Sequence, residues 1–232
     1  MAGIGTLGEK TLHAYLKNFI EPDTSRHEVK LGRYIADILR SDGSVVEIQT
    51  RSYHKLRPKL DAFLGDHAVT VVFPMPVVKY LSWIDPHTGA SSPRRKSPKV
   101  YTLNDALWEL SMIRDYLTHP KLSVRFIALS LTEYRLPSSN GSHGRGSVRV
   151  DRVPEAVLND FTIASPRDYR AAVPTTLSDT FTVTEYAAAA HINRKRAEIA
   201  VRLLTYLSVL ETAGKRGRAA LYRIKGDDGE CT

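Results

Sequence analysis

Two acidic residues inside apolar segments constrain this chain more than any other feature of its sequence. Asp37 lies within residues 34–39 and Glu47 within residues 45–50, and both segments are rich in the β-branched and apolar residues typical of strands. A carboxylate with such neighbours is costly to remove from water unless a cation meets it. Because carboxylate oxygens are ligands that Mg²⁺ prefers, the pattern predicts a divalent metal site on a β-hairpin.

The turn between the two segments decides whether the acids can meet. A two-residue loop would place the two side chains on opposite faces of the hairpin. A three-residue loop at positions 41–43 would place Asp37 directly across from Glu47, on the same face. Gly43 favours the longer loop, because a type I turn closed by a left-handed glycine has this length. We therefore expect the two carboxylates to converge.

Gln49 and Glu9 complete the candidate site. Gln49 follows Glu47 by two residues and so shares its face of the strand. Glu9 lies at the border of the apolar stripe of a helix expected over residues 3–20. A metal ion held by Asp37 and Glu47, with Glu9 as a further ligand, would neutralise phosphate charge and lower the pKa of a bound water. The set therefore predicts metal-dependent hydrolysis of phosphodiesters.

Position 49 departs from what this chemistry normally uses. A lysine there would orient the attacking water and stabilise developing negative charge, whereas Gln49 can form hydrogen bonds but carries no charge. Cations nearby in the sequence are candidates to supply the charge: Arg51, Lys55 and Lys59. A second interpretation makes Asp37 and Glu47 surface residues of the strands. Their partners would then be nearby arginines: Arg33, Arg40 or Arg51.

Periodicity and turn residues predict a mixed α/β domain with helices on both sides of a small mixed sheet. The expected order is a helix, three antiparallel strands, a helix, a strand, a hairpin, a helix and a strand. Their ranges are 3–20, 27–31, 34–39, 45–50, 52–65 (capped by Ser52), 68–73, 80–101, 103–117 and 124–131. The Gly- and Ser-rich residues 138–147 predict a linker or a loop tip. We place the domain boundary after them, which gives domains 1–165 and 166–232.

This order of elements resembles the PD-(D/E)XK nuclease superfamily, the restriction-endonuclease-like fold, over residues 5–135. Asp37 on the second strand and Glu47-Ile48-Gln49 on the third carry the resemblance. It implies a mixed sheet flanked by helices and cleavage of double-stranded DNA that depends on Mg²⁺ or Mn²⁺. The catalytic residues that it implies are Glu9, Asp37, Glu47 and Gln49. Two positions depart from the family pattern, since Ala36 replaces the usual proline and Gln49 the usual lysine.

The C-terminal region carries two helix signals. Thr182 and Glu185 form the capping box of a helix expected over residues 183–190. Asn193 can cap a second helix, which we expect to run to about residue 212 and end at Gly214. A strand at residues 220–224 follows.

A helix-turn-helix followed by a two-stranded hairpin resembles a winged helix, here over residues 166–225. In that family the second helix enters the major groove and the wing touches the DNA backbone. The DNA contacts implied are Arg194, Lys195, Arg196 and Arg202 on the helix, with Arg216 and Arg218 on the wing. The other use of such a domain is as a docking surface for a protein.

The net charge favours a polyanionic partner. The chain has 33 Lys and Arg against 25 Asp and Glu, a net charge of +8. Basic surfaces raise the local concentration of nucleic acid. A polar loop over residues 85–99 adds three candidates for phosphate contact, which are Arg94, Arg95 and Lys96. One cysteine excludes an internal disulfide, and no apolar run suits a membrane span or a signal peptide, so we expect a cytoplasmic protein.

The favoured interpretation is a Mg²⁺-dependent DNA endonuclease with a C-terminal DNA-binding domain. Its close rival is a nuclease fold that binds DNA without cleaving it, and Gln49 is the residue that favours this rival. A third interpretation is a protein-docking subunit of a defence or mobile-element complex. The sequence leaves open whether the protein forms a homodimer or a larger complex.

Overall fold

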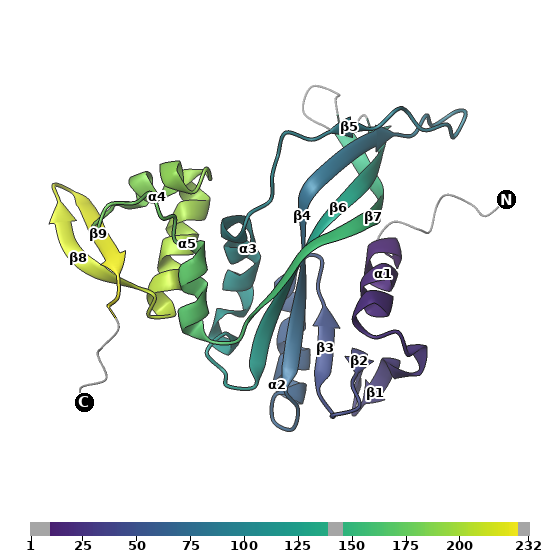
Figure 1. The fold of residues 1–232 in the computed structure, drawn as a ribbon, viewed down its shortest axis with the longest axis horizontal. Coiled ribbons are helices and arrows are strands. Elements are labelled where there is room, and N and C mark those ends of the chain that lie inside the picture. Colours follow the sequence, from purple (N-terminus) through teal and green to yellow (C-terminus); the bar gives the residue numbers. More distant parts are fainter. Residues whose placement is uncertain (1–9, 139–145, 227–232) are drawn as a thin grey trace. The chain divides into compact units, whose positions relative to one another are not determined.

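The computed structural model describes residues 10–138 and 146–226, which form two compact units (Figure 1). Unit 1 combines described residues from the ranges 1–50, 70–101 and 125–161. Unit 2 combines those from 51–69, 102–124 and 162–232. Each unit is therefore assembled from three separate stretches of the chain.

A large sheet makes up most of unit 1. Its strands follow the order β1-β2-β3-β4-β6-β7, and the short β5 pairs with β4. Their bounds are β1 His27–Leu31, β2 Tyr34–Leu39, β3 Val45–Ile48, β4 Val69–Trp83, β5 Arg95–Lys96, β6 Leu122–Ser138 and β7 Gly146–Ile163. β1 pairs with β2 and β2 with β3, both antiparallel. The predicted three-stranded antiparallel segment is confirmed.

Helix α1, Lys10–Ile20, packs on the sheet through its apolar face. Leu12 and Leu16 are one turn apart and fully buried, which places them on the same side of the helix. They join an apolar cluster from four strands of the sheet: Ile38, Val46, Ile48, Val72, Ile127 and Leu129. Burial of each leucine contributes about 1.5–3 kcal/mol. This packing fixes α1 against β2 and β3, and the short helix η1, Thr24–Arg26, leads on to β1.

β4 is longer than the sequence predicts. We expected separate strands at residues 68–73 and from residue 80, but β4 is continuous. Pro74 and Pro76 are tolerated within it because N–H groups alternate between the two edges of a strand. The N–H group that each proline lacks would point to the edge of β4 where the Val72 carbonyl lies. That carbonyl accepts a hydrogen bond from Gln49 N–H, just after β3. β3 has ended there, so no ladder partner is lost.

β7 has no counterpart among the predicted strands. It lies at the edge of the sheet, and exposed and half-buried residues dominate its length. Pro154 falls inside it, which is acceptable on an edge strand. A polar strand of this kind gives a weak periodic signal, so only the sheet order identifies it.

Unit 2 is mostly helical. Its elements are η2 Tyr53–Leu56, α2 Arg57–Phe63, α3 Leu103–Leu110, η3 Ser111–Tyr116, η5 Pro166–Ala172, α4 Val183–Ala189, α5 Arg194–Tyr206, β8 Leu210–Arg216 and β9 Ala219–Ile224. A buried polar network links α3, η5 and α4. Asn104 Nδ2 donates to the Ala172 carbonyl at 2.8 Å, and the Tyr186 hydroxyl donates to Asn104 Oδ1 at 2.6 Å. Because these buried groups satisfy one another, they hold the three elements in a fixed arrangement.

Two predicted helices of unit 2 are wrong in detail. Ser52 adopts a left-handed φ of 56° and makes no side-chain capping bond, so the chain begins as the 3-10 helix η2 before α2. The predicted helix over residues 103–117 divides into α3 and the 3-10 segment η3, and within η3 the dihedral angles of Ile113 are non-helical. Among the described residues no helix is long and apolar enough to cross a membrane.

The last helix also ends earlier than predicted. α5 stops at Tyr206 rather than at Gly214, because Ser208 takes the left-handed conformation with φ 58° and the chain turns into β8. Gly214 instead lies within β8, at a register shift between Thr212 and Gly214, where its φ is 110°. Leu210, assigned to the helix by its spacing, is a buried strand residue. A leucine near the core fits either element, so the spacing could not separate them.

Candidate functional site

The β2–β3 hairpin has the predicted three-residue loop. Arg40 N–H donates to the Ser44 carbonyl at 2.9 Å, and Gly43 N–H donates to the Arg40 carbonyl at 3.0 Å. Gly43 has φ 79°, the left-handed conformation that closes such a loop. The ladder pairs Ile38 with Val46 and Leu39 with Val45. The next position in this register sets Asp37 directly across from Glu47, so the register prediction is confirmed.

At this position, side-chain carboxylates rather than backbone carbonyls accept the hydrogen bonds between β2 and β3. Asp37 N–H donates to Glu47 Oε1 at 3.3 Å, and Ile48 N–H donates to Asp37 Oδ2 at 2.7 Å. One residue later, Gln49 N–H donates to the Val72 carbonyl of β4 at 3.1 Å. The two acids therefore occupy the point where β3 leaves β2 for β4. Each side chain accepts a backbone hydrogen bond from the opposite strand, which fixes its orientation.

Burial distinguishes the two interpretations of this pair. Glu47 is only 2% exposed, and the Asp37 side chain is 17% exposed. The alternative that made Glu47 a surface residue is therefore wrong. Two adjacent carboxylates away from water are costly unless cations or hydrogen-bond donors offset their charge.

A third acid lies in the same row of the sheet. β1 pairs His27 with Ile38 and Val29 with Ala36, so Glu28 falls opposite Asp37. Glu28 adopts a left-handed φ of 54°, which is uncommon for a residue other than glycine. Acids at neighbouring positions on adjacent strands destabilise a sheet through repulsion. Glu28, Asp37 and Glu47 thus form a row across β1, β2 and β3 that needs positive charge.

Helix α1 supplies basic groups to this row. His13 Nε2 lies 3.3 Å from Asp37 Oδ2, and Lys17 Nζ lies 2.7 Å from Glu28 Oε1. The hydrogen bond from Lys17 is the main cause that lowers the pKa of Glu28, and the negative charge of Asp37 acts in the opposite direction. The Lys17 side chain is 12% exposed, whereas that of Glu28 is 69% exposed. The Lys17 side chain is thus largely buried, whereas the carboxylate that it contacts stays in solvent.

Sequence reasoning missed Lys17 and Glu28. Lys17 follows His13 by four residues, so the helical repeat was the signal that places both on one side of α1. Glu28 gave no such signal, because its place in the row depends on the β1–β2 register.

The other predicted site residues have different surroundings. Gln49 is half-buried just after β3, while Glu9 lies outside the described residues. Arg51, Lys55 and Lys59 belong to unit 2, where Arg51 and Lys55 are exposed and Lys59 is half-buried. Within the described part of the chain, no group of three or more His, Cys, Asp or Glu side chains is arranged to hold a metal ion. Two neighbouring carboxylates nevertheless fit Mg²⁺, which proteins commonly bind through one or two carboxylates with water and phosphate oxygens.

The two helices and the hairpin predicted for the C-terminal region are present in unit 2 (Figure 1). Thr182 and Glu185 form the predicted capping box of α4, and the Asn193 side chain caps α5 by accepting from Arg196 N–H. β8 and β9 pair antiparallel, and Phe181 bridges to Tyr222 of β9. The helix caps were predictable because each depends on residues only three positions apart.

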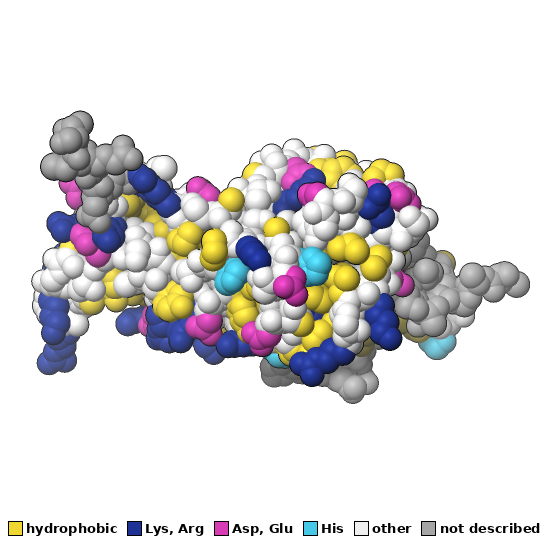
Figure 2. All heavy atoms as spheres, turned by 90° about the horizontal axis from the view of Figure 1, so that it is seen from below, with side chains coloured by type: hydrophobic (Ala, Val, Ile, Leu, Met, Phe, Trp, Pro, Cys, Tyr) yellow, Lys and Arg dark blue, Asp and Glu magenta, His cyan; other side chains and the backbone are white. Residues whose placement is uncertain are grey.

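Four of the nine residues predicted to contact DNA form ion pairs with carboxylates of this chain. These ion pairs are Arg194–Glu198, Arg196–Asp105, Arg216–Glu185 and Arg94–Glu155. Among the described residues, no carboxylate pairs with the other five: Lys195, Arg202, Arg218, Arg95 and Lys96. Lys195 Nζ lies 5.6 Å from the centroid of the Trp108 ring, Arg202 is exposed on α5, and Arg218 is in the β8–β9 turn. Figure 2 shows Lys and Arg side chains projecting from the β8–β9 hairpin.

Comparison with known proteins places the chain in a family. Residues 10–164 match the model of a family described as "Domain of unknown function (DUF8091)", and the chain belongs to that family. A relative from Treponema pallidum (strain Nichols), described as an uncharacterized protein, is 28% identical over 221 residues. The match covers 95% of this chain and 87% of the relative, so it includes both units. No solved structure matches the chain significantly.

Proposed function

We propose that this member of the DUF8091 family is a Mg²⁺-dependent DNA endonuclease whose active site is built around Asp37 and Glu47. The observation that carries the proposal is this cross-strand pair, which lies where β2 and β3 separate. A hairpin needs no two desolvated acids for its stability, since apolar residues there would cost less. The order α1-β1-β2-β3-α2-β4 and the strand order β1-β2-β3-β4 agree with the nuclease core that the sequence resembles.

Asp37 and Glu47 would hold the metal ion. When bound, the ion neutralises charge on the scissile phosphate and lowers the pKa of a coordinated water. The N–H groups of Ile48 and Asp37 orient the two carboxylates, and His13 contacts Asp37 Oδ2. The oxygen donors are therefore held in place before substrate binds, which is the arrangement that efficient metal sites need.

Lys17 supplies the positive charge that Gln49 lacks. Its ammonium group contacts the row of acids at Glu28, whose carboxylate is mostly in solvent. An ion pair with an exposed partner is weak, so Lys17 can exchange Glu28 for a phosphate oxygen at little cost. Gln49 would then contribute a hydrogen bond to the attacking water rather than charge.

Unit 2 would bind the duplex through basic residues that no carboxylate neutralises. Lys195 and Arg202 on α5 and Arg218 in the β8–β9 turn meet this condition among the described residues. Arg194, Arg196 and Arg216 would contribute less, because each already pairs with an acid. Phosphate contacts of this kind give affinity without sequence preference.

A second function, DNA binding without cleavage, is favoured by Gln49. Loss of the charged group at this position removes transition-state stabilisation but leaves the fold intact. In that case Asp37 and Glu47 would serve only to cap the N–H groups at the end of the β2–β3 ladder. Metal binding separates the two functions, because the second does not require it.

A plasmid-nicking assay with the full-length protein tests the proposal. Supercoiled DNA is incubated with Mg²⁺ or Mn²⁺, and metal binding is measured by calorimetry. Asp37→Asn and Glu47→Gln should each lose cleavage at least about 100-fold, since metal contacts contribute several kcal/mol to such reactions. Asp66→Asn, which alters an exposed acid of unit 2, is the matched control and should keep the wild-type rate.

Three results are informative. Cleavage that survives both site variants places the active site elsewhere. Duplex binding without metal binding or cleavage supports the second function. If the protein neither cleaves DNA nor binds a duplex or a metal ion, both functions are contradicted and a protein-docking role is favoured.

The DNA-binding part has its own test in the salt dependence of duplex affinity. Each lost phosphate contact lowers the slope of log K against log salt by about 0.9, so Lys195→Gln with Arg202→Gln should flatten it by roughly 2. The control pair, Arg194→Gln with Arg216→Gln, removes the same charge from paired residues and should change the slope less. An equal change in both pairs would mean that only net charge matters. No change in either pair would mean that these residues do not face DNA.

A further inference from the structure

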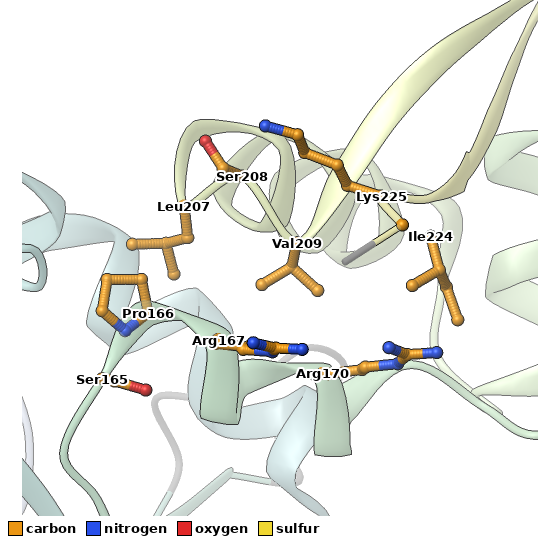
Figure 3. Close-up of a pocket in the computed structure, with 10 residues that line it drawn as sticks. Ser165, Pro166, Arg167, Arg170, Leu207, Ser208, Val209, Ile224 and Lys225 are labelled. Atoms are coloured by element: carbon orange, nitrogen blue, oxygen red, sulfur yellow. The ribbon is translucent and has the colours of Figure 1, made fainter. Parts of the chain in front are cut away.

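A pocket of about 330 Å³ lies within unit 2 (Figure 3). Three segments line it: the start of η5, the turn between α5 and β8, and the end of β9. The volume is in the range that binds small molecules. Its walls combine apolar groups, including Leu207, Val209 and Ile224, with the cations Arg167, Arg170 and Lys225. The pocket is therefore suited to a ligand with both an anionic and an apolar part.

The geometry of η5 puts two of the cations on one side. A 3-10 helix has three residues per turn, so side chains three positions apart lie above one another. Arg167 and Arg170 have this spacing, and Figure 3 shows both extending along the pocket opposite Val209 and Ile224. η5 is held in this form by a capping box, in which Asp168 Oδ2 accepts from Ser165 N–H at 2.8 Å. The buried side chain of Tyr169 anchors the other side of the helix.

None of the described residues that line this pocket is an acid. Its polar lining consists of the three cations and the side chains of Ser165 and Ser208. Among the described residues, the Arg170 side chain has no hydrogen-bond or ion-pair partner. Like charges on one wall repel one another, and an anion between them removes this cost. Guanidinium groups match the geometry of phosphate oxygens, which they bind in a bidentate manner.

We propose that this pocket binds a phosphate group attached to an apolar or aromatic body, as in a nucleotide. Arg167 and Arg170 contact the phosphate oxygens, Lys225 adds charge from the opposite wall, and Leu207, Val209 and Ile224 pack against the body of the ligand. The phosphate belongs either to a free nucleotide or to a nucleic acid strand. The inference does not depend on the proposed nuclease site, because it concerns different residues in the other unit.

Calorimetric titration of the full-length protein tests the site, with AMP, inorganic phosphate and a short DNA duplex as probes. AMP should bind more tightly than inorganic phosphate, because only AMP fills the apolar wall. Arg170→Gln should weaken AMP binding about 10- to 100-fold, the loss expected for a hydrogen-bonded charged group. Arg223→Gln is the matched control, since Arg223 lies close by on β9, pairs with Glu211 and does not line this pocket. It should change AMP affinity by less than about threefold, within the small effect of an exposed charge.

The duplex distinguishes the two sources of phosphate. If Arg170→Gln weakens AMP binding but binds the duplex as tightly as Arg223→Gln does, the site takes a free nucleotide. If it weakens both by a similar factor, the phosphate comes from a nucleic acid strand. The proposal is overturned if neither probe binds saturably, or if Arg170→Gln and Arg223→Gln have the same effect on both.

Discussion

Replacing Lys17 with methionine separates a catalytic cation from a structural ion pair. Methionine keeps most of the length of the largely buried side chain and removes only the ammonium group that lies 2.7 Å from Glu28 Oε1. Apolar contacts made by the stem of Lys17 should therefore survive. If Lys17 has the role proposed above, the variant should fold normally and cleave DNA slowly.

The two effects differ in size. The Glu28 carboxylate is 69% exposed, and ion pairs with such partners contribute about 0.2–1 kcal/mol to stability. A loss of this size leaves a domain of ordinary stability folded. Removal of one preorganised group that stabilises transition-state charge typically lowers the rate by about 10²–10³. A rate loss of that size in a protein of nearly unchanged stability cannot come from partial unfolding.

The assay is single-turnover nicking of plasmid DNA at saturating Mg²⁺, with unfolding in urea measured in parallel. Lys17→Arg keeps the charge and should retain more activity than Lys17→Met. The double variant Lys17→Met with Gln49→Lys should recover at least about tenfold of the lost rate, because position 49 shares a face with Glu47. A rate for Lys17→Met within about threefold of the wild type would refute this role. So would a loss that the lysine at position 49 fails to rescue. A wild-type protein without cleavage would contradict the nuclease proposal itself.

Further predictions concern stability. Tyr186→Phe should lower the free energy of unfolding by about 1–3 kcal/mol in urea titrations, since it leaves Asn104 Oδ1 without its buried donor; no change would mean that the network adds nothing. Gly43→Val should lower Tm more than Gly43→Asn, because asparagine tolerates the left-handed φ of 79° and an added Cβ meets nothing within 4 Å; equal losses would refute backbone strain. Hydrogen bonds, chiefly from Ser165 N–H, hold the pKa of Asp168 below its ordinary 3.8, so its stabilisation is complete above that pH and is lost as the pH falls through the lowered pKa. Asp168→Asn should therefore be less stable than the wild type at pH 7, with the difference closing in acid; a constant difference would contradict it.

The β2–β3 hairpin could be predicted from the sequence because its information is local. A left-handed glycine sets the loop, the loop sets the register, and the register sets Asp37 across from Glu47. The helix caps at Thr182 and Asn193 were predictable for the same reason. Each of these features depends on residues within a few positions of one another.

Contacts between residues far apart in the sequence could not be predicted from it. Arg196 had the charge and helical position of a DNA contact, yet it pairs with Asp105, a residue 91 positions earlier in the chain. Charge patterns show where cations lie along a helix but not which of them an acid already neutralises. Glu28 and Lys17 raise the same difficulty, since their meeting requires both the β1–β2 pairing and the docking of α1.

Several destabilising features coincide at one row of the sheet in unit 1. Glu28, Asp37 and Glu47 bring three acidic residues to neighbouring positions on β1, β2 and β3, the last of them buried. Glu28 also has a left-handed backbone, which costs about 1–2 kcal/mol in a residue other than glycine. Stability alone would remove each of these features by a single substitution. Because strain and unfavourable burial persist where a function requires them, their coincidence at the point where β3 leaves β2 favours chemistry there over any structural role for the same acids.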